Sequence, residues 1–156
     1  MTDAFGTTTV DVSPGEWVAT AASLRDDEGS SCDFFDWLSA YDDGDIGLAV
    51  VLRVWSVARR TGVILRTHVP RDGGTLPTLT GVWAGAAWHE RETFEMFGIA
   101  FVGHPDLRPL LLPDGFEGHP LRKEFVLASR VAKEWPGAKE PGESTPGRKR
   151  PFGVPK

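Results

Sequence analysis

Two stretches in the middle of the chain have the hydrophobic patterns of β-strands. The stretch 46–57 is β-branched and apolar, and in 63–69 every second residue is suited to one buried face. A period of two is typical of a strand with one side in a core. An aromatic-rich stretch, 32–38, predicts a third strand, and Asp, Asp, Gly and Asp at 42–45 predict a turn after it. Three strands joined by short connections favour an antiparallel meander.

Two other stretches have the spacing of amphipathic helices. Ser13 is suited to an N-cap, and Glu16, three residues later, would complete a capping box, so a helix is predicted from there to about Gly29. A second helix is predicted over Ala86–Phe97, with Gly98 ending it in the left-handed conformation that glycine adopts easily. Each helix has one apolar side and therefore needs a surface on which to pack.

The remaining stretches give weaker signals. Residues 1–12 contain no strong pattern, 76–83 is predicted to be irregular, and 99–128 is predicted to form loops with at most short strands. Residues 129–156 form a basic tail rich in Pro and Gly, which cannot build a core of its own. We therefore predict one α+β domain, residues 1–128, followed by this extended tail. Its fold is a two-layer arrangement in which a small mixed or antiparallel sheet is covered by two helices.

The charge of the chain limits its partners. The net charge is −5, and residues 1–45 carry eleven acidic side chains and one basic side chain. A protein that binds nucleic acid is usually basic, because it must neutralise phosphates. The basic tail lacks the interleaved aromatic residues of a stacking platform for bases. We therefore predict no nucleic-acid partner.

Cysteine content and hydrophobic run lengths indicate the compartment. Cys32 is the one cysteine of the chain, so an internal disulfide, a Cys-ligated iron–sulfur cluster and a Cys-rich zinc site are all excluded. It stands beside Phe34 and Phe35 and is predicted to be a small buried hydrophobic residue. The first residues have neither the basic nor the apolar part of a secretory signal. The longest aliphatic run, 46–52, is far shorter than the ~20 residues of a membrane-spanning helix, so membrane contact is expected only through a partner.

Charged residues are concentrated in the second predicted helix and in the loops after it. The helix carries three carboxylates around one arginine, and the loops supply His, Arg and Lys. Because arginine and carboxylate form directional pairs, we predict that the loops dock back on the helix through such pairs. The flanking aromatic residues favour this, or a subunit interface, over a solvated helix face or a catalytic cluster. The candidate residues for structural ion pairs or a subunit interface are Glu90, Arg91, Glu92, Glu95, His104, Asp106, Arg108, His119, Arg122 and Lys123.

Motifs for catalysis or cofactor binding are not complete. His89-Glu90 could begin a His-Glu-x-x-His zinc site, but position 93 is Thr. His89 and Glu92 are spaced to share a metal on a helix, yet they supply too few ligands by themselves. No glycine-rich stretch has phosphate-binding spacing in a strand-to-helix context. We predict no catalytic, cofactor-binding or metal-binding residue in this chain.

The segment 88–125 resembles the signature of the thirty-kilodalton family of respiratory complex I. The match consists of Glu90-Arg91-Glu92, then Glu95 with two hydrophobic residues, and then His104, Arg108 and two leucines. A second hallmark of the family, Gly-His-Pro-Leu-Arg-Lys, is present at 118–123. The resemblance extends over roughly residues 13–128 and is most specific in 88–125.

The resemblance implies a function. Members of this family are non-catalytic subunits of the peripheral arm of proton-translocating NADH:quinone oxidoreductase, an enzyme complex of the respiratory chain. The implied partners are the large quinone-site subunit of that complex and its iron–sulfur subunit. FMN and the iron–sulfur clusters would be carried by partner subunits and not by this chain. The implied location is peripheral, on the cytoplasmic face of the cell membrane.

Two alternatives stay open on the sequence alone. One is the equivalent subunit of a membrane-bound hydrogenase or of a dehydrogenase with another electron donor, since such complexes share this module. The other is a free-standing enzyme that uses Glu92, Glu95 and His104 as an acid–base cluster.

Overall fold

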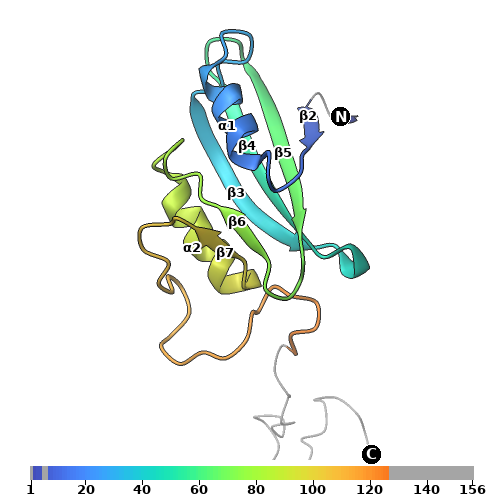
Figure 1. Ribbon diagram of the computed structural model, residues 1–156, viewed down its shortest axis with the longest axis vertical. Helices are drawn as coiled ribbons and strands as arrows, with labels where there is room; N and C mark the ends of the chain where they lie inside the picture. Colours follow the sequence, from blue (N-terminus) through green and yellow to red (C-terminus); the bar gives the residue numbers. More distant parts are fainter. Residues whose placement is uncertain (1, 5–6, 127–156) are drawn as a thin grey trace, which may run out of the picture. The chain divides into compact units, whose positions relative to one another are not determined.

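The computed structural model describes residues 2–4 and 7–126, and these residues form a mixed α+β fold of one main sheet and two helices (Figure 1). The predicted α+β class is confirmed. The predicted tail, 129–156, lies outside the described residues, as do the last two residues of the predicted domain.

The predicted meander forms three consecutive strands of the main sheet. Strands β3 (Phe34–Asp42), β4 (Leu48–Ser56) and β5 (Thr61–Val69) pair antiparallel in the order of the sequence. The predicted turn between the first two of these strands contains a short 3-10 helix, η1 (Gly44–Ile46). Strand β3 begins later and continues further than the predicted 32–38, because Ser39, Ala40 and Tyr41 pair in register with β4.

The alternation along the central strands separates a core face from an open face. On β4 the side chains of Leu48, Val50, Leu52 and Val54 are fully buried. The residues that alternate with the last three of these, Val51, Arg53 and Trp55, are half-buried. The buried side joins one hydrophobic cluster with Trp17 of the first helix and Phe97 of the second. Cys32 lies in this cluster with no exposed surface, as predicted, and burial raises the pKa of its thiol.

Two strands at the N-terminus extend the sheet and were not predicted. Strand β1 (Thr2–Ala4) pairs antiparallel with β2 (Thr7–Asp11), and β2 pairs parallel with β5, so the strand order is β1-β2-β5-β4-β3. The described side chains of β2 are half-buried or exposed, so no buried face marks it in the sequence. Its run of three threonines and a valine was the available signal, because β-branched residues favour strands.

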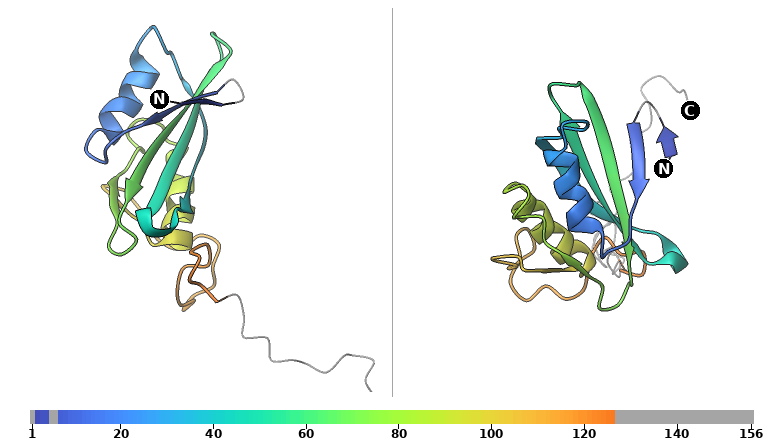
Figure 2. Two further views of the ribbon diagram at one scale, coloured as in Figure 1. Left: turned by 90° about the vertical axis from the view of Figure 1, so that its right-hand side faces the viewer. Right: turned by 45° about the horizontal axis from the view of Figure 1, so that its top comes forward.

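Helix α1 (Trp17–Asp26) lies across the core face of the sheet (Figure 2). It begins three residues later than the predicted capping box requires. Residues 13–16 instead form a turn in which the N–H of Glu16 donates to the carbonyl of Ser13 (3.0 Å). The Glu16 carboxylate does accept from the Ser13 N–H (3.2 Å), but the Ser13 hydroxyl donates to the same carboxylate and caps no helix N–H.

Helix α2 (Ala86–Phe97) packs against the outer strand β3, and it is bounded as the sequence predicts. Gly98 ends it with φ of +74°, in the left-handed region. On either side of α2 along the chain lie the short strands β6 (Thr75–Pro77) and β7 (Ala100–Val102), which pair parallel in a second, two-stranded sheet. Within the described residues, the chain from 103 to 126 contains no helix or strand.

Candidate functional site

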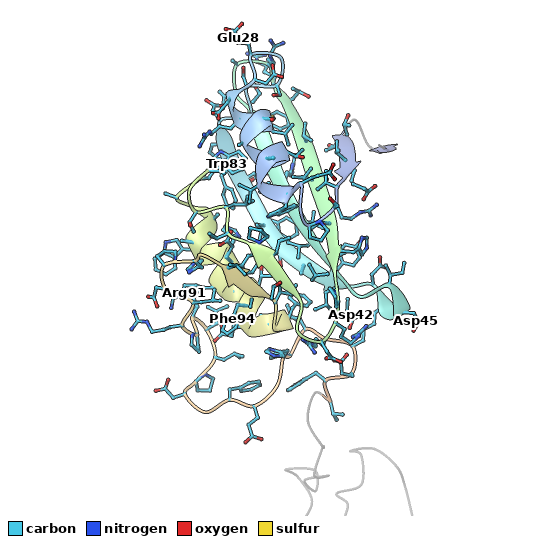
Figure 3. All side chains as sticks on the ribbon, viewed as in Figure 1. Glu28, Asp42, Asp45, Trp83, Arg91 and Phe94 are labelled. Atoms are coloured by element: carbon cyan, nitrogen blue, oxygen red, sulfur yellow. The ribbon has the colours of Figure 1, made fainter. Side chains whose placement is uncertain are left out.

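The candidate residues gather on α2 and on residues 103–126, which we call the C-terminal segment. Figure 3 shows Arg91 and Phe94 of α2 beside this segment, at the end of the molecule opposite Glu28. Phe97, on the inner side of the helix, is buried in the main core, and Phe94 is half-buried against it. Phe97 thus faces the core, while the half-buried Phe94 borders the part of α2 that the segment covers.

Glu90 is fully buried and serves the interior of the domain. Its carboxylate accepts hydrogen bonds from the Thr78 hydroxyl (2.5 Å) and from the backbone N–H of Leu79 (2.6 Å). Burial raises the pKa of the Glu90 carboxyl, and these hydrogen bonds act in the opposite direction. Glu90 therefore fixes the connection between β6 and α2 and lies away from any outer surface.

Glu95 is the main acceptor for the C-terminal segment. It is 5% exposed, and its two carboxylate oxygens accept from the consecutive backbone N–H groups of Leu110, Leu111 and Leu112 at 3.1, 2.9 and 2.7 Å. Hydrogen bonds to an ionised acceptor are stronger than neutral ones. One side chain of α2 thus determines the path of three successive residues that have no secondary structure to hold them.

Arg91 and His104 join the same segment to the helix through carbonyl groups. The Arg91 guanidinium donates to the carbonyls of Arg108 (2.9 Å) and Pro109 (2.8 Å). The Nδ1 atom of His104 accepts from the Asp106 N–H (3.0 Å), so its Nε2 carries the hydrogen that is donated to the Ala87 carbonyl (3.0 Å).

Gly-His-Pro occurs twice in the segment, at 103–105 and at 118–120. The first copy contains His104, and the second binds the C-terminal end of the helix. The Nδ1–H of His119 donates to the Glu95 carbonyl (2.9 Å), and Arg122 donates to the Phe97 carbonyl (2.7 Å). Carbonyls in the last turn of a helix have no partner within the helix, and cations there also interact well with the helix dipole. A Cβ atom on Gly98 would lie 2.5 Å from His119 Nε2 and 2.7 Å from Arg122 Nη2, so glycine is required by packing as well as by φ.

The segment docks on α2 as predicted, but the expected Arg–carboxylate pairs are not what holds it. Within residues 7–126, the arginines of the segment form ion pairs with carboxylates that are not on α2. Asp106 and Arg108 pair with each other on the surface (2.7 Å), and Arg122 lies 3.4 Å from Asp72. Lys123 contributes its backbone N–H, which donates to Asp42 (2.9 Å). Side chains bound to backbone groups replace the predicted side-chain pairs, because a loop without secondary structure has many backbone groups to satisfy.

Sequence reasoning missed a cluster centred on Asp42, which lies at the end of β3 (Figure 3). Arg71 donates two hydrogen bonds to the Asp42 carboxylate (2.5 and 2.6 Å) and one to Glu124 (2.7 Å). Arg71 thereby holds the pKa of the Asp42 carboxyl far below its ordinary value, and the N–H groups of Lys123 and Gly44 act in the same direction. The Asp-Asp pair at 42–43 was interpreted only as a turn signal.

Within residues 7–126, no three His, Cys, Asp or Glu side chains lie close enough to hold a metal ion. Glu95 and His104, two members of the alternative acid–base cluster, bind separate stretches of backbone. None of the described helices has both the length and the apolar character to span a membrane.

A pocket of about 170 Å³ lies between α2 and the segment. Phe94 and Glu95 line it from the helix, and residues 109–119 line it from the segment. Most of its surface is apolar, and Phe116 on its wall stacks on Phe125 with ring centroids 5.9 Å apart. The contacts of α2 thus create a shaped apolar hollow at the surface of the molecule.

The amino-acid sequence of this chain is similar to those of respiratory proteins. Residues 10–131 match the family described as respiratory-chain NADH dehydrogenase, 30 Kd subunit. The matching NADH-quinone oxidoreductase subunit of Roseiflexus sp. strain RS-1 is 40% identical over 126 residues, which is 80% of this chain and 72% of the relative. The equally named subunit of Bordetella petrii is 37% identical over 150 residues, 84% of this chain and 72% of the relative.

Two solved structures share the fold. A trypsin-resistant fragment of Nqo5 superposes with a TM-score of 0.60 at 27% identity, covering 67% of this chain and 86% of the fragment. A chain of the membrane-bound sulfane sulfur reductase, an archaeal respiratory membrane complex, gives a TM-score of 0.65 at 19% identity over 93% of this chain and 88% of its own length. The second likeness shows the fold alone.

Proposed function

Since the chain belongs to the family of the 30 Kd subunit of respiratory-chain NADH dehydrogenase, we propose that it is a non-catalytic structural subunit of the peripheral arm of proton-translocating NADH:quinone oxidoreductase. Its partners are the large quinone-site subunit and the iron–sulfur subunit of the same complex. FMN and the iron–sulfur clusters are carried by other chains, and the assembled arm lies on the cytoplasmic face of the membrane.

The observation that carries this proposal is the way polar side chains join α2 to the C-terminal segment. Arg91, Glu95, His104 and His119 bond to backbone groups and fix a long surface segment in one shape. Such an arrangement prepares a surface before a partner arrives, which lowers the entropic cost of association. Apolar side chains stay exposed on and beside it, among them Trp88 and Leu111, at 61% and 60% exposure. Exposed clusters of this kind mark protein interfaces.

Purification of the chain from its own membranes tests the proposal. With an affinity tag on the full chain and a mild detergent, the quinone-site and iron–sulfur subunits are expected to co-elute and to stay bound at moderate salt. Mass spectrometry of the eluate identifies them. Recovery of the chain as a monomer without these partners would contradict the proposal, and so would a prosthetic group or turnover in the isolated chain.

Substitution Arg91→Ala tests the role of the segment. The carbonyls of Arg108 and Pro109 lose their donor, so we expect several-fold less assembled complex. The complex that does assemble should keep the kinetic constants of the native enzyme. Arg60→Ala, at an exposed position in the β4–β5 connection, is the matched control and should leave the amount of complex unchanged. A changed KM for quinone with normal assembly would contradict a structural role.

The same purification addresses the neighbouring alternative. The fold also occurs in an archaeal respiratory complex that is a sulfane sulfur reductase. Co-elution of an NADH-binding flavoprotein supports the NADH enzyme. Co-elution of a large subunit with nickel-binding Cys-x-x-Cys pairs would instead support a hydrogenase-type complex.

A further inference from the structure

One part of the surface combines a pocket, exposed aromatic residues and a carboxylate without a partner among the described residues. It lies on the outer side of α2 and on the adjoining part of the C-terminal segment. We call it the α2 patch, and it consists of Trp88, Arg91, Glu92, Phe94, Leu111 and Phe116.

The α2 patch is continuous along the helix. The Arg91 guanidinium lies 5.5 Å from the centre of the Trp88 ring and also binds the Pro109 carbonyl. Pro109 lines the pocket together with Phe94 and Phe116. Trp, Arg and aromatic anchors beside a preformed pocket are the usual composition of energetic hot spots at protein interfaces.

The pocket has the size of one large apolar side chain. Its volume is about 170 Å³ and most of its lining is apolar. For comparison, a cavity of about 150 Å³ in another protein accepts a benzene ring. A leucine, methionine or phenylalanine side chain therefore fits, and no ionised group is needed to hold it.

The charges of the α2 patch indicate the rest of the partner. Arg91 is occupied by two carbonyls of the chain itself. Glu92 is half-exposed and follows Trp88 by four positions on α2, so the two side chains share one face of the helix. Its carboxylate makes no hydrogen bond or ion pair among the residues that the structure describes. The patch thus presents one unmatched negative charge beside apolar surface, and a complementary partner supplies a cation there.

We propose that the α2 patch receives one segment of a neighbouring chain of the same complex, which carries a large apolar side chain for the pocket and a Lys or Arg for Glu92. This proposal rests on the proposed function and adds the chemistry of the contact. A lipid surface or a nucleic acid is a poor occupant, because its phosphates would meet Glu92. A second copy fits badly as well, because an isologous contact would have to offer Glu92 the arginine of the patch, which is already bound.

Truncation of the aromatic anchors tests the apolar part. Trp88→Ala and Phe116→Ala change exposed side chains, so the chain should fold as before while at least about tenfold less of it assembles, since a hot-spot residue contributes more than about 1.4 kcal/mol. Ile46→Ala is the matched control, because Ile46 is 67% exposed at the β3–β4 connection, outside the patch. Equal assembly of all three variants would overturn the proposal.

A charge exchange tests Glu92. Glu92→Arg should reduce assembly severalfold, and Glu28→Arg, at the opposite end of the molecule (Figure 3), should not. A photo-crosslinking amino acid at position 116, introduced in the complete complex, identifies the contacting peptide. Its nearest Lys or Arg is then changed to Glu, and this change should restore assembly of the Glu92→Arg chain.

The outcomes separate this proposal from the function on which it rests. A crosslinked peptide from another subunit, with a large apolar residue and a rescuing Lys or Arg, supports the proposal. A crosslink to a second copy, no crosslink within an intact complex, or failure of the charge exchange overturns it and leaves the proposed function standing. Failure of the unaltered chain to co-purify with any other part of the complex overturns both.

Discussion

The three strands of the meander and the C-terminal segment of this molecule are ordered by different means. Strands β3, β4 and β5 satisfy their backbone groups by pairing with one another, and the buried side of each joins one core. The C-terminal segment has neither a ladder nor a core of its own within the described residues. It takes its shape from side chains of α2 and from two histidine turns that bind the backbone of α2.

The difference shows that order in the segment is conditional. The sheet would keep its ladder if the segment were released, whereas the segment loses its partners if α2 moves. Regions with few buried apolar contacts open at lower free energy than core strands do. The following substitutions, from the largest expected effect to the smallest, test whether the segment can lose its order while the sheet keeps its own.

Leu52→Ala should have the largest effect. Leu52 is fully buried on β4 at the centre of the core, and deletion of such a side chain costs about 2–5 kcal/mol of unfolding free energy. Because the segment depends on the sheet, amide protection should fall in β4 and in Leu110–Leu112 together. Hydrogen exchange measures both. Persistent protection of the segment alone would show that it is ordered independently.

Glu95→Ala should act on the segment with little effect on the strands. Loss of an acceptor for N–H groups costs up to about 1–3 kcal/mol when they are buried. Because these N–H groups are only part-buried, the expected response is opening of the segment, in which water replaces the carboxylate. Protection of Leu110, Leu111 and Leu112 should disappear while that of β4 stays. Glu92→Ala, one turn away without a bonded partner in the described structure, should change stability by less than about 0.5 kcal/mol. Equal loss in β4 would show that the segment cannot lose its order while the sheet keeps its own.

Asp42→Asn addresses the junction of the two regions, since Asp42 on β3 binds Arg71 and the Lys123 N–H. The hydrogen bonds from Arg71 lower the pKa of the Asp42 carboxyl from 3.8. Because the pKa is lower in the folded state, this contribution to stability is complete well above pH 3.8 and is lost as the pH falls below it.

At neutral pH the Asp42→Asn protein should therefore unfold at a lower urea concentration than the native protein. The difference should narrow as the pH falls below 3.8, because the Asp42 carboxyl of the unfolded native-sequence chain then takes up a proton before that of the folded protein does. Urea titrations of both proteins, one at neutral pH and one below pH 3.8, measure this difference. A difference that does not change with pH would mean that the ionised form of Asp42 makes no special contribution.

Asp11→Asn should have the smallest effect. Asp11 on β2 accepts from Arg66 on β5 at 2.6 Å, but both side chains are partly exposed. Such pairs contribute about 0.2–1 kcal/mol, and less at high salt. Amide hydrogen exchange should become faster in β2, while exchange in the three strands of the meander should not change. An effect that is insensitive to salt would point to packing and not to charge.

The sequence predicted those parts of the fold that have a local pattern. A run of β-branched and apolar residues identified β4, alternation identified β5, and the apolar stripe with Gly98 gave both ends of α2. Strand β2 was missed because it is held by parallel pairing with β5, more than fifty residues away, and has no buried face to generate alternation. The start of α1 was misplaced because Ser13 and Glu16 bond within a turn.

The candidate segment was predicted more accurately than its contacts. The charged residues of α2 and the two Gly-His-Pro turns do come together, as expected from their spacing and from the resemblance. The partners were wrong because a sequence displays side chains, which suggests pairs between side chains. Backbone N–H and carbonyl groups occur at almost every position. The sequence therefore does not indicate which of them will hydrogen-bond to the side chains of Glu95 and Arg91. The Asp42–Arg71 cluster joins residues 29 positions apart, and no periodicity connects them.

The two histidine turns also set an order of events during synthesis. The carbonyls that they bind, at Ala87 and Glu95, belong to α2, which packs on β3. The groups that bind them leave the ribosome later than the helix does. The surface that we propose for docking is therefore completed only after α2 and the C-terminal segment have both been synthesised.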